Sequence, residues 1–146
     1  MAGSNRKLVL LVSAAFYVAA CFLPAVNPDG EDPVGLVLLM IGALGPTVGE
    51  YRWFANCFYV AGIALALSER PRRLASIICM IAGAAIAISS IPFSPHVMVG
   101  LGNYSLVQAP LAIGGYLWIL AQIVALALPF MSPPPHECPR RAKGIA

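Results

Sequence analysis

Two opposite charges, Glu50 and Arg52, interrupt an otherwise uncharged run of residues from Val34 to Leu67. A carboxylate and a guanidinium there could form a buried functional pair, or could mark the point where an apolar helix meets water. Tyr51 and Trp53 flank them, and such aromatic side chains favour the headgroup level of a bilayer. Two positions apart on a helix, the charges would act together only if the stretch is a turn. We interpret the stretch as the solvated outer mouth of a membrane span, with Glu50, Arg52 and Trp53 as candidate contacts to a partner or ligand.

No other group of residues has the spacing of a catalytic or metal site. The four cysteines have neither CxxC spacing nor a nearby histidine pair, which argues against a zinc site and a dithiol redox motif. A Ser-His-Asp set, paired carboxylates and a phosphate-binding glycine loop are also missing from the sequence. The basic residues form three short clusters rather than one patch for nucleic acid. We therefore expect no enzymatic activity, no cofactor and no nucleic-acid partner.

The composition indicates several membrane spans. Of the 146 residues, 60% are hydrophobic and 10% are charged, and the mean hydropathy is +0.83. A soluble domain of this length would have close to a quarter of its residues charged. The apolar residues also lie in long blocks with short polar segments between them, as in a polytopic helical protein in contact with the lipid bilayer.

The positions of the basic clusters fix the number of crossings. Basic residues gather at 6–7, 70–73 and 140–143, and the positive-inside rule places all three clusters in the cytoplasm. The chain must then cross once out and once back before residue 70, so the stretch 34–67 holds a single span. Gly45-Pro46 separates that span from the apolar segment before it. We predict an all-α fold with both termini in the cytoplasm of a bacterial inner membrane. The predicted spans lie at about 8–24, 50–67, 74–91 and 111–130, and a short interfacial or re-entrant segment lies at about 34–45.

The domain organisation follows from these spans. We expect residues 1–131 to form a single four-helix membrane domain, and residues 132–146, proline-rich and then basic, to form a disordered cytoplasmic tail. Residues 92–110 should form a loop near an interface. For the first block, Val18 to Cys21 also resembles a lipoprotein signal, although the apolar residues after Cys21 favour an uncleaved span. Cys21 and Cys57 fall near the outer ends of two spans, where an oxidising periplasm would permit a disulfide.

The polar and small residues inside the spans predict how the helices meet. The spans contain no Asp, Glu, Lys, Arg or His at depth, which argues against ion-coupled transport. Asn56 and Gln122 are costly to expose to lipid, so each is expected to bond across helices. Small residues recur every four positions on the third span and form a candidate helix-packing face, within one chain or a homo-oligomer. These residues are Ala75, Cys79, Gly83 and Ala87.

Two stretches carry a resemblance to known proteins. They read YRWFANCFYVAGIAL, from Tyr51, and GGYLWILAQIVAL, from Gly114. They resemble small uncharacterised four-span bacterial inner-membrane proteins, which pair a helix starting aromatic-Ala-Asn with a Gly-Tyr-Leu-Trp helix. The resemblance covers the second and fourth spans and implies the fold without an activity. Two functions stay open: an accessory or immunity-type interaction protein with a membrane-protein partner, or a small homo-oligomeric channel or transporter for a neutral or apolar solute.

Overall fold

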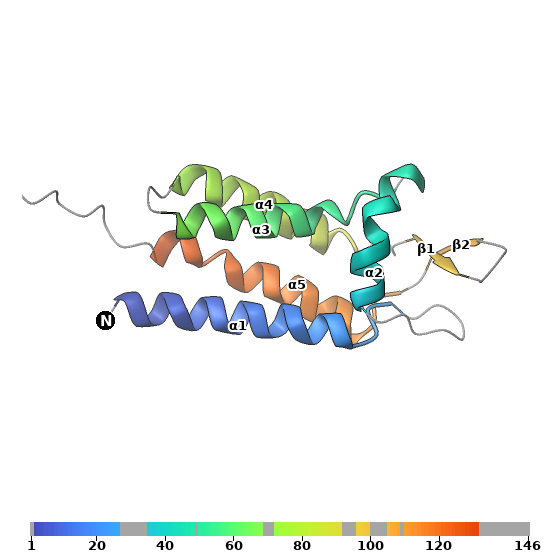
Figure 1. The fold of residues 1–146 in the computed structure, drawn as a ribbon, viewed down its shortest axis with the longest axis horizontal. Helices are drawn as coiled ribbons and strands as arrows, with labels where there is room; N and C mark the ends of the chain where they lie inside the picture. The colour runs from blue at the N-terminus through green and yellow to red at the C-terminus, as the bar shows by residue number, and fades with distance from the viewer. Residues whose placement is uncertain are drawn as a thin grey trace, which may run out of the picture.

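In this computed structural model, the chain is described over residues 2–26, 35–48, 50–68, 72–91, 96–99, 105–108 and 110–131. The described residues are mostly helical, which confirms the predicted helical class. Four long helices lie side by side (Figure 1): α1 (Ala2–Phe22), α3 (Phe54–Leu67), α4 (Arg73–Ile88) and α5 (Ile113–Ala125). A 3₁₀ turn, η2 (Leu128–Met131), follows α5, because Pro129 cannot donate the backbone hydrogen bond that an α-helix needs there.

The four long helices form two antiparallel pairs, α1 with α5 and α3 with α4 (Figure 1). α4 and α5 bring the pairs together, and we call the interface between the pairs the seam. The buried face of α3 consists of Ala55, Tyr59, Gly62 and Ala66. Small side chains on this face let α4 approach closely, so that the Ser76 hydroxyl donates to the Gly62 carbonyl at 2.8 Å.

The packing face observed on α4 differs in part from the predicted one. Gly83 and Ala87 are buried as expected, whereas Ala75 and Cys79 are only partly buried. Ser76 and Met80 take the buried positions instead. A strict four-residue repeat drifts around a helix with 3.6 residues per turn, so a face that stays against one neighbour alternates steps of four and three.

A short helical segment and a β-hairpin lie at the end of the helix pairs where α1 and α4 finish (Figure 1). The segment consists of α2 (Gly35–Ile41) and the 3₁₀ helix η1 (Gly42–Val48), and it lies across the long helices. It occupies the stretch predicted at about 34–45. Residues 92–110, predicted as a loop, include an antiparallel hairpin of β1 (His96–Val99) and β2 (Ser105–Gln108), with His96 opposite Gln108.

The chain that leaves α1 is hydrogen-bonded to the starts of α2 and α5. The Leu23 carbonyl accepts from Gly35 N at 3.0 Å, and the Pro24 carbonyl accepts from Gly114 N at 2.8 Å. Gly114 is required by this close approach, since a Cβ there would lie 2.7 Å from the Pro24 carbonyl oxygen. Val26 and Leu111 form an isolated β-bridge beside it. These bonds hold α1, α2 and α5 together at one end of the molecule.

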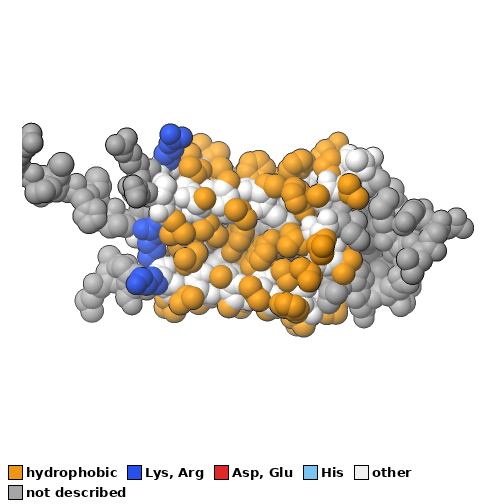
Figure 2. Space-filling model, viewed as in Figure 1, with side chains coloured by type: hydrophobic (Ala, Val, Ile, Leu, Met, Phe, Trp, Pro, Cys, Tyr) orange, Lys and Arg blue, Asp and Glu red, His pale blue; other side chains and the backbone are white. Residues whose placement is uncertain are grey.

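Charged and apolar side chains occupy different parts of the surface (Figure 2). Among the described residues, Arg6, Lys7, Arg72 and Arg73 lie at the end where α1 and α4 begin. Arg6 donates to the Ala66 carbonyl at the end of α3. The flanks of the long helices expose large apolar side chains, among them Leu8, Leu11, Phe22, Leu74, Ile78, Ile81, Ile113, Leu120 and Ile123.

Two helical segments are long and apolar enough to cross a membrane, Asn5–Phe22 and Ile113–Met131. The helices Phe54–Leu67 and Arg73–Ile88 are apolar but shorter. The four predicted spans therefore correspond to four apolar helices, of which two have the length of a span. The predicted tail, residues 132–146, lies outside the described residues.

Candidate functional site

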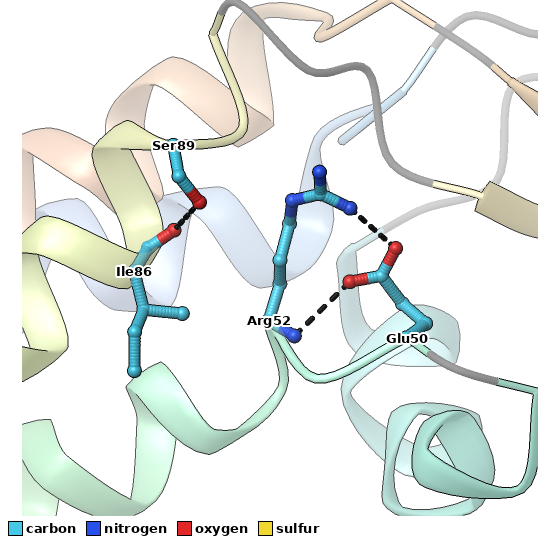
Figure 3. A network of polar contacts seen from close by, with 4 residues as sticks. All are labelled: Glu50, Arg52, Ile86 and Ser89. Carbon is cyan, nitrogen blue, oxygen red and sulfur yellow. Dashed lines mark hydrogen bonds and ion pairs between the residues drawn. The ribbon is translucent and has the colours of Figure 1, made fainter.

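Glu50 and Arg52 form an ion pair at the start of α3 (Figure 3). The Arg52 Nη1 atom lies 2.5 Å from Glu50 Oε2, and Arg52 N donates to Glu50 Oε1 at 3.0 Å. The Arg52 side chain is only 21% exposed, and the Glu50 side chain only 14%. The pair is thus mostly covered by protein, unlike the solvated charges that the sequence suggested.

A turn brings the two charges together, because α3 begins at Phe54 rather than at the predicted residue 50. Three tight backbone bonds define the turn, from Phe54 N to Tyr51 O, from Ala55 N to Arg52 O and from Asn56 N to Trp53 O. Each spans three residues, which is a 3₁₀ pattern at a helix N-terminus. The Glu50 carboxylate accepts a hydrogen bond from the backbone N–H of Arg52. This bond satisfies a backbone donor just before the helix begins.

Trp53 connects this turn to α2. Its indole Nε1 donates to the Leu39 carbonyl at 2.9 Å, so the ring is directed at the protein and is partly buried. Gly42 provides the space for the ring, since a Cβ at that position would lie 2.3 Å from Trp53 Cδ1. The three predicted outer-face residues, Glu50, Arg52 and Trp53, thus lie together, and Tyr51 beside them is 59% exposed.

Asn56 is the hydrogen-bond acceptor at which three helices meet. Its Oδ1 accepts from the Tyr17 hydroxyl of α1 at 3.0 Å and from the Trp118 indole of α5 at 2.7 Å. An indole N–H can only donate, so Oδ1 must be the atom that faces Trp118, which fixes the orientation of the amide. Asn56 therefore joins α3 to the α1/α5 pair across the seam.

A second set of bonds lies one turn deeper in the seam. The Ser13 hydroxyl donates to the Ala121 carbonyl at 2.8 Å, so its oxygen accepts from the Tyr59 hydroxyl at 2.7 Å. The Tyr59 ring stacks on the Tyr17 ring with centroids 5.0 Å apart. We refer to Ser13, Tyr17, Asn56, Tyr59 and Trp118 as the polar layer.

Gln122 is buried without a hydrogen bond to any described residue. Its side chain is 2% exposed, and neither Nε2 nor Oε1 has a partner within the described part of the chain. The amide lies against Gly83 of α4, where a Cβ would come within 2.9 Å of Oε1. The predicted interhelical contact of Gln122 is thus a packing contact in the structure, in contrast to the bonds that Asn56 makes.

A cavity of about 170 Å³ lies between the Glu50–Arg52 pair and the polar layer. It is partly open, and it lies between the end of α1, α2, the turn before α3 and the start of α5. Its aromatic and polar lining residues are Tyr17, Cys21, Glu50, Arg52, Trp53, Asn56, Ser90 and Trp118. Its aliphatic wall includes Ala20, Val26, Leu38, Leu39 and Leu111. A concave, largely apolar space with a few polar groups is typical of a small-molecule site.

The cavity lining offers groups that can bind a small molecule. Across residues 2–26, 35–48, 50–68, 72–91, 96–99, 105–108 and 110–131, no three His, Cys, Asp or Glu side chains lie close enough to hold a metal. Cys21, which lines the cavity, and Cys57 are free thiols. Hydrogen bonding and apolar contact are the interactions that these lining residues can supply.

Sequence reasoning missed most of the polar layer. Tyr17, Tyr59 and Trp118 were not candidates, although two of them lie at helical spacing from a polar residue: Tyr17 is four positions after Ser13, and Tyr59 is three positions after Asn56. Two such polar pairs on neighbouring helices are the signal that could have predicted a shared buried layer. Comparisons of the chain with protein families, curated proteins and solved structures find no match, so function has to be inferred from the site itself.

Proposed function

We propose that the chain is a four-span protein of the bacterial inner membrane with both termini in the cytoplasm. It acts without catalysis, as an accessory or immunity-type protein that binds a membrane-protein partner through its outer end. The observation that carries the proposal is the asymmetry of the two ends. Basic residues lie at one end, and the ion pair, the cavity and the crosswise α2 lie at the other.

The lengths of the apolar segments support four spans. With the adjoining turns included, the shorter segments run from Tyr51 to Leu67 and from Arg73 to Ile91. At 1.5 Å per residue they rise about 26 and 28 Å, which approaches the roughly 30 Å of a hydrocarbon core. Their exposed side chains are largely apolar, as lipid-facing positions require.

The ends of the helices support the orientation. Lys7 lies near the start of α1 and Arg72 directly before α4, and both helices begin at the same end of the molecule. The positive-inside rule assigns that end to the cytoplasm. Arg73 lies over the Phe130 ring, 5.5 Å from its centroid, so the end of η2 reaches the same level. The Glu50–Arg52 pair then belongs to the outer side, where its charges are paired with each other.

The inward direction of the polar groups favours an interaction protein over a homo-oligomeric channel. A pore between copies of the chain would need polar side chains on the outer surface of the helices. Asn56 bonds within one chain, and Gln122 is buried inside it. Exposed groups at the outer end, with Tyr51 and Phe54 stacked 6.4 Å apart, give a partner a surface to contact.

Capture of a partner from native membranes tests the proposal. Tagged protein is purified in mild detergent, and a stoichiometric co-purifying membrane protein is expected by mass spectrometry. Tyr51→Asp should lose that partner, whereas Lys7→Glu, an exposed change at the opposite end, should retain it. A homo-oligomer without a partner that conducts a neutral solute in liposomes would overturn the proposal in favour of a channel.

The orientation is tested separately by labelling single cysteines in a cysteine-free background. Tyr51→Cys should react with a membrane-impermeant maleimide in intact spheroplasts. Arg72→Cys, at the opposite end, should react only after permeabilisation. Equal labelling of both positions before permeabilisation would contradict four spans with cytoplasmic termini.

A further inference from the structure

Asn56 lines the cavity, and its amide carries a hydrogen-bond donor in a fixed orientation. Its Oδ1 already accepts from Tyr17 and Trp118, so the amide cannot turn over without facing Nδ2 toward a donor-only indole. Asn56 lines the cavity, and no described residue accepts a hydrogen bond from its Nδ2 group. A donor held in a mostly apolar space is stabilised by any acceptor that enters it.

The charges beside the cavity are paired with each other. Glu50 Oε2 and Arg52 Nη1 lie 2.5 Å apart, and both residues contribute to the lining. A charged ligand would have to displace one partner of this largely covered pair, and breaking such a pair is costly. The lining therefore favours a neutral ligand.

The size and the walls of the cavity indicate the size and shape of the apolar part of the ligand. An apolar cavity of about 150 Å³ accepts a benzene molecule, and this cavity has a volume of about 170 Å³. Trp53, Trp118 and the Tyr17 ring provide flat apolar walls, and glycines at 35, 42, 114 and 115 bring backbone close on the other sides. One ring or a short acyl segment fills such a space.

From these three observations we infer that the cavity binds a neutral, largely apolar molecule through a carbonyl oxygen that accepts a hydrogen bond from Asn56 Nδ2. The inference rests on the proposed function only for the source of the ligand, because a membrane-embedded site draws such molecules from the bilayer. Two membrane components carry this chemistry, the ring carbonyl of a quinone and the acyl carbonyl of a lipid ester. The binding chemistry is the same for both.

The test compares two probes of the same shape, acetophenone and α-methylstyrene, which differ only in C=O against C=CH₂. Trp53 and Trp118 are the two tryptophans of the chain and both line the cavity, so tryptophan fluorescence of the purified full-length protein reports binding there. After correction for partition into protein-free micelles, acetophenone should bind saturably and roughly threefold to tenfold more tightly than the alkene. Equal affinities would show that the carbonyl oxygen accepts no hydrogen bond in the cavity, and a lack of saturable binding would show that the cavity takes up neither probe. Either result would overturn the inference.

Two variants locate the binding. Ala20→Leu fills the cavity and should abolish binding of both probes, whereas Ala15→Leu, an exposed change on the same helix, should leave it unchanged. Asn56→Asp keeps an oxygen for Tyr17 and Trp118 but replaces the amide donor. At about pH 8, where a carboxyl group is normally ionised, Asn56→Asp should remove the preference for acetophenone and leave the affinity for α-methylstyrene unchanged. Gel filtration and thermal unfolding establish whether each variant is folded. If Ala20→Leu does not fold, the test rests on Asn56→Asp.

Competition identifies the source. A decyl-substituted benzoquinone and methyl decanoate are titrated separately against bound acetophenone. Displacement by one of them assigns the site to ring or to acyl carbonyls, and displacement by neither would overturn a membrane source. Partner capture and probe binding are independent readouts, so failure of one proposal is distinguishable from failure of the other.

Discussion

The Trp118 indole on α5 donates a hydrogen bond to the Asn56 amide oxygen on α3, 2.7 Å away, across the seam. Asn56 belongs to the stretch that begins at Tyr51, and Trp118 to the stretch that begins at Gly114. Each stretch supplies one half of this interhelical contact, and the Tyr17 hydroxyl donates to the same Asn56 oxygen.

A double-mutant cycle should measure this contact directly. We expect Asn56→Leu and Trp118→Phe to show a coupling of about 0.5–1.5 kcal/mol in the free energy of unfolding. Asn56→Leu removes the acceptor of the Trp118 indole, and Trp118→Phe removes one of the two donors to Asn56. Trp53→Phe is the matched control, since its indole bonds to Leu39 and not to Asn56. Additive effects of Asn56→Leu and Trp118→Phe in detergent unfolding would contradict the geometry.

Glycines at two close contacts should differ in their tolerance of alanine. Gly114→Ala is expected to lower the free energy of unfolding by about 1–3 kcal/mol, because the new Cβ meets the Pro24 and Leu23 carbonyl oxygens at 2.7 and 2.8 Å. Gly62→Ala meets the flexible Met80 side chain at 2.6 Å and gains helix propensity, so its cost should be smaller. Thermal unfolding of the two variants side by side checks the order, and the reverse order would show that α1 and α5 are less closely joined.

Gln122 should be replaceable by an apolar residue. Gln122→Leu removes a buried amide that has no hydrogen-bond partner among the described residues, and we expect it to raise the free energy of unfolding by about 0.5–2 kcal/mol. Ser13→Ala is the comparison, because it removes a hydroxyl that bonds to Tyr59 and Ala121, and it should lower that free energy by about 1 kcal/mol. A similar decrease in the free energy of unfolding in both variants would mean that the Gln122 amide is hydrogen-bonded in the folded protein.

The ion pair should tolerate exchange better than removal. Glu50→Gln is expected to lower the free energy of unfolding by about 1 kcal/mol, since the pair is mostly covered. Combining Glu50→Arg with Arg52→Glu should recover part of the loss caused by either reversal alone, but not the bond from the Arg52 amide to the Glu50 carboxylate. Arg72→Gln, exposed at the other end, should change stability by no more than about 0.5 kcal/mol. Chemical unfolding of the five variants, the two single reversals included, provides the comparison.

The helices could be predicted from the sequence because long apolar blocks between basic clusters leave few other solutions. The predicted range 74–91, for example, contains nearly all of α4. The start of α3 could not be predicted as closely, because it depends on Glu50 accepting the amide of Arg52, a local bond that hydropathy does not reveal. The hairpin was missed for a related reason, since its strands are four residues each and lie in a proline-rich stretch.

The site could be predicted only in its separate parts. Glu50, Arg52, Trp53 and Asn56 were all candidates from the sequence, but their common cavity depends on α2 lying across the helix ends. The donors to Asn56 come from α1 and α5, and hydropathy does not show which helices become neighbours. That pairing is a property of the tertiary structure, as is the burial of Gln122 against Gly83.

The pairing of the helices also sets an order of events during synthesis. α3 and α4 are consecutive and can join as soon as both are made, whereas α1 packs on α5, the last long helix that the structure describes. Ribosomes add about 5–20 residues per second, so α1 waits several seconds for its neighbour. During that interval Ser13 lacks the Ala121 carbonyl to which it donates, and Tyr17 and Asn56 meet without Trp118. The cavity is therefore completed late, when α5 arrives and closes its last wall.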